Sequence, residues 1–411
     1  MERSRTPRGN RCYALIVFLM AIGASAAGAQ AQIGATFETI AVLDGNPFAA
    51  DLVLSGDGET ALIRQRDTAA GNLLWTRADG LLRVDELPGV PGLGFDPIDI
   101  TRDGSRIVGN LEDQAYIWDR GVGATALTAL PGGDGLTRVD SISANGQHIV
   151  GSSRDGSTIA PAFGFAAPAE VPVIWDGAGL APTPLGAPIG TAPIAYVSDN
   201  GVVAGTLFES IASEQFAITS YRWSMDDEFQ RIGNTGSFPS VLGISDDGEE
   251  IIQYGRSPIG AESIVRPNEG TVFWSGEPGP LDFVSISGYE TLVDVDPLTL
   301  RPRERIALSE LDATGTRGVG SVRSDAVYWS RDEGLQDLDV LLASVEIDTE
   351  GWSFLRGSSI SSDGKTILGL GSFSDGDVLT YHAFLATIPE PSTALLLSLG
   401  LAGLARKPRV R

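Results

Sequence analysis

The chain has 411 residues, with 29 basic and 53 acidic side chains and a formal net charge of −24. Binding of DNA, RNA or anionic lipid depends on lysine and arginine, so this acidity excludes nucleic acid as an expected partner. The single cysteine, Cys12, excludes a disulfide framework and a cysteine zinc site, so the fold has to be stabilised by packing.

The first 31 residues have the pattern of a secretory signal peptide. Four arginines between Arg3 and Arg11 form a positive region, an apolar core follows from Tyr13 to Gly23, and residues 27–31 offer small side chains for cleavage. Cys12 lies before the apolar core, so no lipoprotein-type cysteine stands at the cleavage point. We expect residues 1–31 to be removed on export; an uncleaved amphipathic or transmembrane N-terminus is the alternative.

Residues 33–387 contain an internal repeat. A tetrapeptide that starts with Ser, Thr or Asp and ends in Gly occurs seven times, starting at Ser55, Thr101, Ser143, Ser198, Ser245, Asp312 and Ser361. Six of the seven contain Asp-Gly or Asn-Gly, pairs that allow the positive φ angles of tight hairpins. Each tetrapeptide therefore predicts a turn between two strands.

Two further strands are predicted in the repeats, except that the seventh has only the first of them. An aromatic strand ends at Trp75, Trp118, Trp175, Trp223, Trp274, Trp329 or Phe384, and the spacing from one of these aromatics to the next is 43 to 57 residues. A fourth strand follows, for instance at 81–87, 124–130, 230–234, 281–285 and 335–341. Such units are typical of propeller blades, and the position of each tryptophan at the end of an alternating strand favours packing between blades over a sugar-stacking surface.

The seventh repeat lacks a fourth strand, whereas an unpaired strand, Phe37 to Leu43, precedes the first. Pairing the two would remove an exposed sheet edge. We therefore predict an all-β, seven-bladed β-propeller closed by an N-terminal strand; six or eight blades, or a β-solenoid, are the alternatives.

The repeat resembles the extracellular HAF repeat. Ile-Ser-x-Asp-Gly, then Ile-Val-Gly, then an aromatic strand carry the resemblance, which is best in the last unit, with Ser361 to Gly364 and the triplet His382-Ala383-Phe384. Most other units lack the His-Ala-Phe triplet. The resemblance implies a secreted β-repeat protein without an assigned chemistry.

Two inserts interrupt the repeat and predict binding loops, since loops on a rigid scaffold often carry function. They are residues 158–172, rich in Ala and Pro, and residues 287–306. The second contains Arg301, Arg303 and Arg305, a positive cluster that suits an anionic exopolysaccharide. A plain solvated loop is the alternative.

The last 23 residues resemble the PEP-CTERM sorting signal, which exosortase enzymes recognise and remove in Gram-negative bacteria. An apolar run, residues 393–405, separates a Pro-Glu-Pro tripeptide from a basic end, and it is shorter than the about 20 residues of a permanent membrane anchor. The signal residues are Pro389, Glu390, Pro391, Ser392, Arg406, Lys407, Arg409 and Arg411. The resemblance implies an exosortase-type partner, a transient stay in the inner membrane through this short segment, and a final place at the cell surface or in the biofilm matrix.

No catalytic residue is predicted. Only His148 and His382 follow the signal peptide, and both sit at strand positions that favour a structural role over that of a general base. Asp294 and Asp296 suggest calcium, but the spacing lacks the other ligands of an EF-hand loop, so no cofactor is expected.

Two functions remain open at this point. The first is a non-enzymatic surface or matrix protein that binds polysaccharide or other proteins. The second is an extracellular polysaccharide hydrolase or lyase that uses acidic residues on the propeller, because a glycosidase needs only two suitably placed carboxyl groups.

Overall fold

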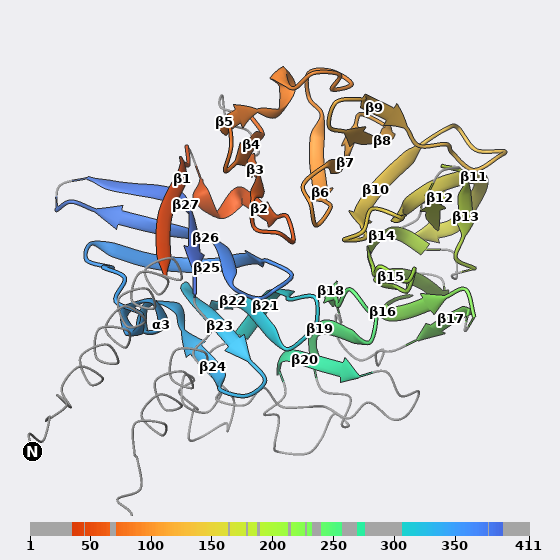
Figure 1. Cartoon of the computed structure of the whole chain (residues 1–411). Coiled ribbons are helices and arrows are strands. Elements are labelled where there is room, and N and C mark those ends of the chain that lie inside the picture. Colours follow the sequence, from red (N-terminus) through yellow and green to blue (C-terminus); the bar gives the residue numbers. More distant parts are fainter. Residues whose placement is uncertain are drawn as a thin grey trace, which may run out of the picture.

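The computed structural model describes residues 35–44, 46–65, 71–162, 165–177, 180–186, 190–212, 215–226, 228–231, 240–256, 269–275, 306–376 and 378–388. Within them the chain is a β-propeller, with the blades arranged around a central axis (Figure 1). The strands β2, β6, β10, β14, β18, β21 and β25 lie nearest the axis, and their residues line a common cavity. The all-β prediction is therefore confirmed.

The described strands form six hydrogen-bonded sheets. Three of them have four strands that follow one another along the chain: β2 (Ala50–Leu54), β3 (Thr60–Gln65), β4 (Leu73–Thr76) and β5 (Gly80–Arg83); β6 (Asp96–Ile100), β7 (Arg106–Leu111), β8 (Gln114–Asp119) and β9 (Gly123–Ala126); and β21 (Ile306–Leu311), β22 (Arg317–Val322), β23 (Asp325–Ser330) and β24 (Gly334–Asp337).

The other three sheets differ in size. The largest contains β10 (Thr137–Ile142), β11 (His148–Ala162), β12 (Phe165–Asp176), β13 (Pro182–Pro184), β14 (Gly190–Val197), β15 (Val203–Ala212), β16 (Gln215–Ser224) and β17 (Glu228–Arg231). A three-stranded sheet contains β18 (Ser240–Ile244), β19 (Glu250–Arg256) and β20 (Glu269–Ser275). The last contains β25 (Trp352–Ile360), β26 (Thr366–Ser374), β27 (Leu379–Thr387) and β1 (Thr36–Val42), and is called the closing blade below.

As far as the chain is described, the propeller thus has six blades, and the predicted number of seven is wrong, although six was an alternative. The difference arises at the third and fourth sequence repeats, which share the eight-stranded sheet. Glu170 of β12 pairs with Gly190 of β14. This pairing joins the strands of the third repeat to those of the fourth in one sheet. The extension of β11 and β12 includes residues 158–162 and 165–172, so much of the first insert continues a hairpin and does not form the predicted loop.

The predicted closing strand is confirmed. β1 runs antiparallel to β27, from the pair Thr36 and Thr387 to the pair Val42 and His382. The Phe37 ring packs against Trp352, Phe354 and Phe384, with ring centroids 5.0, 5.6 and 5.7 Å away. The N-terminal strand therefore covers the edge of β27 and adds an aromatic contact to the closing blade.

Each tetrapeptide is a turn between the innermost strand of a repeat and the strand after it. In the first, Gly58 has φ +74°, and its amide donates to the Ser55 carbonyl at 2.8 Å. The Ser55 hydroxyl donates to Asp57 Oδ1 at 2.6 Å and accepts the amide of Thr60 at 2.9 Å. Asp312 replaces the serine in the sixth repeat and accepts the amide of Thr316 through Oδ1, so this divergent sequence keeps the turn.

Three of the fourth strands are shorter than predicted, and the one predicted at 281–285 lies outside the described residues. β5, β9 and β24 have four residues each, and β5 leads into a 3-10 helix, η2 (Val84–Glu86); a second 3-10 helix, η1 (Pro47–Ala49), precedes β2. The strand predicted at 335–341 ends at Asp337, because Asp337 caps the helix α3 (Leu338–Ser344) by accepting the amide of Asp339. Leu338 and Leu342 of α3 are buried against the closing blade.

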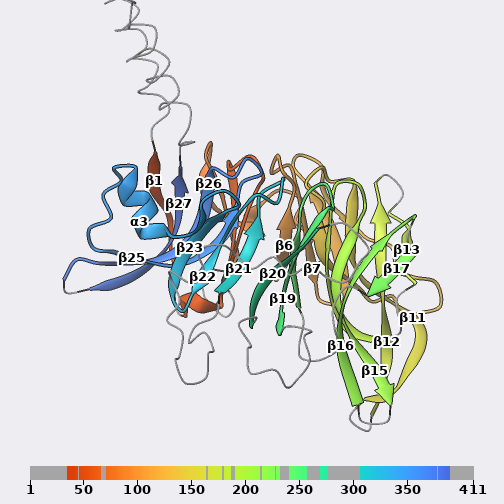
Figure 2. The same cartoon turned by 90° about the horizontal axis from the view of Figure 1, so that it is seen from below.

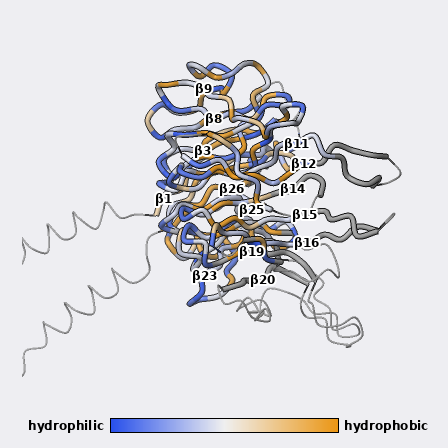
Figure 3. The backbone as a smooth tube through the Cα atoms, turned by 90° about the vertical axis from the view of Figure 1, so that its right-hand side faces the viewer, coloured by the Kyte–Doolittle hydropathy of each residue, from blue (hydrophilic) through white to orange (hydrophobic). Residues whose placement is uncertain are grey.

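The core lies within and between the blades. Hydrophobic stretches lie along the strands and hydrophilic ones at many of the bends of the chain (Figure 3). Five tryptophans at the ends of aromatic strands are buried: Trp75, Trp118, Trp175, Trp223 and Trp329. The indole N–H groups of Trp118 and Trp175 donate to the carbonyls of Pro88 and Thr128, at 3.0 and 2.8 Å. These contacts confirm the structural interpretation of the tryptophans.

Candidate functional site: the central cavity and its turn ring

The seven turns meet at one end of the propeller axis and form what we call the turn ring. Backbone groups of neighbouring turns bond to each other: Ala313 N to Ser362 O (3.1 Å), Ser362 N to Gly56 O (2.8 Å), Asp57 N to Arg102 O (2.7 Å), Arg102 N to Ala144 O (2.8 Å) and Asp199 N to Asp246 O (2.8 Å). The amide of Asn145 adds a bond to Asp199 Oδ1 at 2.6 Å. The turns of different blades are thereby fixed to one another.

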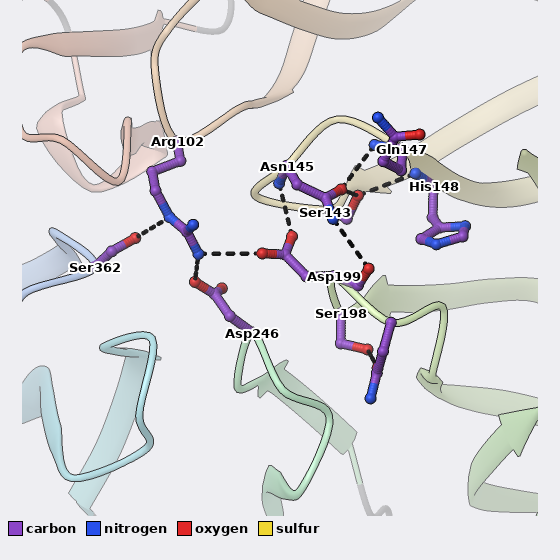
Figure 4. Close-up of polar contacts among 10 residues, drawn as sticks. Arg102, Ser143, Asn145, Gln147, His148, Ser198, Asp199, Asp246 and Ser362 are labelled. Carbon is purple, nitrogen blue, oxygen red and sulfur yellow. Dashed lines mark hydrogen bonds and ion pairs between the residues drawn. The ribbon is translucent and has the colours of Figure 1, made fainter. Parts of the chain in front are cut away.

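Arg102 extends across this ring (Figure 4). Its guanidinium donates to Asp199 Oδ2 at 3.1 Å, to Asp246 Oδ2, and to the Ser362 hydroxyl at 3.2 Å. Burial by itself would lower the pKa of Arg102, but the two carboxylates outweigh it and raise that pKa. Desolvation raises the pKa of Asp246 in spite of the arginine. A single cation thus joins turns of four sequence repeats.

A cavity of about 320 Å³ lies along the axis beside the turn ring. Its walls come from the last residues of the innermost strands, and Arg102, Asp246 and Ser362 line it at the ring end. Cavities that bind small ligands are concave, of about 300–1,000 Å³, with a few polar groups. By its size and position, this cavity is the candidate binding site.

Four side chains in the cavity wall carry its chemistry. Burial raises the pKa of Asp140 and of Glu310 to about 8, and it also raises the pKa of Asp99. Burial and the negative charges of Asp140, Asp99 and Glu310 raise the pKa of Tyr196, so its hydroxyl stays protonated. At neutral pH the cavity therefore contains carboxylic acids and a phenol, groups that both donate and accept hydrogen bonds.

Two of the acids also hold neighbouring blades together. Asp99 Oδ2 accepts the Ser141 hydroxyl at 2.8 Å and the Ile142 amide at 3.0 Å. Glu310 Oε2 accepts the Ser359 hydroxyl and the Ile360 amide in the same way. Asp140 differs, because its Oδ2 atom is buried without a hydrogen-bond partner. Asp140 is therefore the cavity acid with an unused acceptor.

Sequence reasoning did not find these residues because the innermost strands are bulged. The pairing register shifts by one residue shortly before the turn in five of them, between Pro97 and Asp99, Val139 and Ser141, Val241 and Gly243, Leu308 and Glu310, and Gly357 and Ser359. A bulge breaks the alternation of the strand and redirects a side chain. The recurring signal was an acidic or hydroxyl residue two positions before the tetrapeptide, at Asp99, Ser141, Glu310 and Ser359.

Both histidines have structural contacts. His148 Nδ1 lies 2.7 Å from Asp176 Oδ1, and its ring packs under the next turn, where a Cβ on Gly201 would lie 3.3 Å from Cε1. His382 Nε2 lies 2.7 Å from the Thr380 hydroxyl and its ring meets the Trp352 ring edge-on. Desolvation lowers the pKa of His382. These contacts agree with the structural roles predicted for both residues.

The other sequence-predicted site residues lie outside the described residues. These are the arginines Arg301, Arg303 and Arg305, the aspartates Asp294 and Asp296, and the sorting-signal residues Pro389, Glu390, Pro391, Ser392, Arg406, Lys407, Arg409 and Arg411. Among the residues that are described, no group of three His, Cys, Asp or Glu side chains is placed to hold a metal ion. Within the same ranges, no helix is long and apolar enough to cross a membrane.

The end of the chain matches a known sequence model. The PEP-CTERM protein-sorting motif matches residues 387–410. This chain carries that motif. It is the recognition signal for exosortase-type processing and indicates an exported protein of a Gram-negative cell surface. A comparison with curated proteins finds no match.

Solved structures resemble the propeller at low identity. TolB from Acinetobacter baumannii is 15% identical (TM-score 0.34), with 70% of this chain and 62% of TolB covered. The propeller domain of the Trilobed protease from Pyrococcus furiosus is 12% identical (TM-score 0.45; 81% and 93% covered), and Pyrococcus horikoshii acylaminoacyl peptidase is 11% identical (TM-score 0.46; 85% and 54% covered). The chain thus spans less than two thirds of TolB and about half of the peptidase. The likeness is one of fold alone.

Proposed function

We propose that this protein is an exported, non-enzymatic surface or matrix protein, sorted by an exosortase-type enzyme, whose propeller binds a polysaccharide in the central cavity. The sorting motif at residues 387–410, which begins where the closing blade ends, carries the first part of this proposal. The signal peptide predicted at residues 1–31 and the resemblance to extracellular HAF repeats support the same destination. Binding of another protein at the surface is the alternative within this function.

The chemistry of the cavity supports a sugar as its ligand. Sugar hydroxyls both donate and accept hydrogen bonds, and so do the protonated carboxyls of Asp140 and Glu310 and the hydroxyl of Tyr196. A strongly anionic ligand would meet these acids and an acidic protein surface. The cavity therefore favours a neutral sugar unit, whereas Arg301, Arg303 and Arg305 remain a sequence-based proposal for anionic exopolysaccharide.

A glycan array probed with the processed protein tests this function. We expect binding to a neutral glycan, and we expect Asp140→Ala, which removes the carboxyl group, to weaken it by about threefold to tenfold, because one lost hydrogen bond is worth about 0.5–1.5 kcal/mol. Asp332→Ala, at an exposed position outside the cavity, is the matched control and should bind normally. Undiminished binding by the Asp140 variant would place the ligand elsewhere, and failure to bind any glycan would favour a protein partner.

The second candidate, a polysaccharide hydrolase or lyase, is favoured by the same acids. A carboxyl with a pKa of about 8 stays protonated at neutral pH, which is what a general acid of a glycosidase requires. Incubation of the processed protein with the polysaccharide it binds, followed by assay of new reducing ends and unsaturated products, decides between the two. Release of products that stops in both Asp140→Asn and Glu310→Gln would replace the binding function by the enzymatic one.

A further inference from the structure

Both ends of the propeller leave the closing blade at the same place. Thr36, the first residue of β1, pairs with Thr387, the last residue of β27. Thr387 also pairs with Thr366, which lies two residues after the turn at residues 361–364. The amide of Ile388 then donates to the carbonyl of Lys365 at 2.8 Å. The chain therefore enters and leaves the propeller on the face that carries the turn ring, which we call the turn face.

The opposite face carries the hairpins between the second and third strands of the repeats, and we call it the hairpin face. β7 and β8 meet there at Leu111 and Gln114, and β22 and β23 at Val322 and Asp325. The long β11–β12 and β15–β16 hairpins extend to the same side (Figure 2). In this view β1 begins and β27 ends on the other side of the molecule.

The length of the chain limits how far the turn face can be from the membrane. The apolar run of the sorting motif starts at Thr393, six residues after Thr387. Six residues span at most about 20 Å when fully extended. The nine residues of β27 are about 30 Å long, which places the hairpin face of the closing blade farther away than this connection can reach.

The charge of the turn face indicates that the short link between Thr387 and Thr393, and not lipid binding, determines which face of the propeller is near the membrane. The third residue of every turn is exposed, and four of the seven are aspartates: Asp57, Asp103, Asp247 and Asp363. Carboxylates are repelled by anionic lipid headgroups. The turn face is thus held close to the membrane without adhering to it.

We propose that, before the sorting signal is removed, the propeller stands on the inner membrane with its turn face toward the lipid and its hairpin face outward. The Arg102 end of the cavity then points to the membrane, and Thr387 lies within about 20 Å of the start of the apolar run. This inference follows from the sorting motif and the strand pairing, and it does not depend on the ligand of the cavity.

The scarcity of cysteine makes the orientation measurable. In a chain that starts at residue 32, and so lacks the predicted signal peptide and contains no cysteine, Thr314→Cys places a fluorophore on the turn face and Ser324→Cys places one on the hairpin face of the same blade; both residues are exposed. This chain, with its sorting signal intact, is reconstituted into vesicles of phosphatidylethanolamine and phosphatidylglycerol with headgroup-labelled acceptor lipid. We expect flotation with the vesicles and more energy transfer from position 314 than from position 324.

A second form with a long Gly/Ser segment inserted between Ile388 and Pro389 is the control. Such a linker is a flexible coil, so the difference between the two positions should be lost. Equal transfer from both positions in the native-length chain would overturn the proposal. A difference that persists with the long linker would also overturn it, because the turn face would then bind lipid directly. Failure of the chain to float with the vesicles would overturn it as well.

Discussion

At the scale of single residues, Arg102 connects its own turn with three other turns of the ring. It meets two carboxylates and a hydroxyl from three other turns while it is itself only half-buried. Exposed ion pairs contribute little to stability, but removal of one partner from a partly buried group leaves like charges facing each other. Arg102 therefore stabilises the ring mainly by compensating Asp199 and Asp246.

Arg102→Ala should lower the free energy of unfolding by about 1–2 kcal/mol, a value reduced for the partial exposure of the three groups. Urea denaturation of the two proteins measures this change. Asp246→Asn, added to Arg102→Ala, should restore part of the loss, because it removes one of the two facing charges. Arg120→Ala, at an exposed position, is the control and should change stability by less than about 0.5 kcal/mol. A loss of the same size in both single variants would argue against a special role of Arg102.

The cavity acids predict a pH dependence. The pKa values of Asp140 and Glu310 are about 8 in the folded protein, compared with their ordinary values of 3.8 and 4.5. Between pH 4 and 8 the folded state thus binds more protons than the unfolded state, so the free energy of unfolding should fall as pH rises through this window. The pKa of aspartates such as Asp103 is lowered, so they take up protons at more acidic pH and do not mask the effect.

Urea denaturation at pH 5 and pH 8 checks the sign. The wild-type chain should be less stable at pH 8, and the double variant Asp140→Asn with Glu310→Gln should lose less stability over the same interval, because its side chains cannot ionise. A wild-type chain that gains stability from pH 5 to pH 8 would show that these acids ionise normally in the cavity.

At the scale of elements, the closing blade depends on β1. Phe37 connects β1 with three aromatic rings of the neighbouring strands, whereas Val42 at the other end of β1 is 60% exposed. Phe37→Ala should cost about 2–3 kcal/mol, somewhat less than a fully buried Phe. Val42→Ala should be nearly neutral. Both are measured by chemical denaturation.

Deletion of residues 33–45 is the stronger test of closure. It removes the whole of β1 and leaves β27 as an exposed edge, which should lower the melting temperature and promote self-association. Thermal unfolding and light scattering measure the two effects. A deleted chain that melts like the complete one and stays monomeric would show that β1 is dispensable.

The elements also show how far the sequence alone was informative. The turns and the closing strand were predictable because Asp-Gly and Asn-Gly pairs report local backbone geometry, and an unpaired first strand matches a missing last one. The number of blades was not predictable, because the pairing of Glu170 with Gly190 joins two repeats through a contact that no local sequence pattern indicates. The cavity acids escaped prediction for a similar reason, since the bulges before the turns change which side chains face the axis.

At the scale of the whole molecule, the described residues form a ring of blades whose first and last strands, β1 and β27, lie next to each other. Thr36 and Thr387 are paired, so cleavage at either end leaves the hydrogen bonds between β1 and β27 in place. The propeller should therefore keep its fold after processing. Urea denaturation of the precursor and of the processed form should give the same unfolding midpoint.

Removal of the tail is the prediction that follows most directly from the sorting motif at residues 387–410. Prolines lack a backbone donor, so Pro389 and Pro391 cannot extend β27, and the Pro-Glu-Pro site remains a separate segment between the last strand and the apolar run. In the native host, mass spectrometry of surface-extracted protein should find a C-terminus that lacks Arg406 to Arg411. Glu390→Gln should leave a longer form in the inner membrane fraction, while Asp332→Asn, remote from the motif, should be processed normally. An intact Arg411 in the exported protein would mean that the tail acts only as a weak anchor, and processing by an exosortase-type enzyme would have to be abandoned.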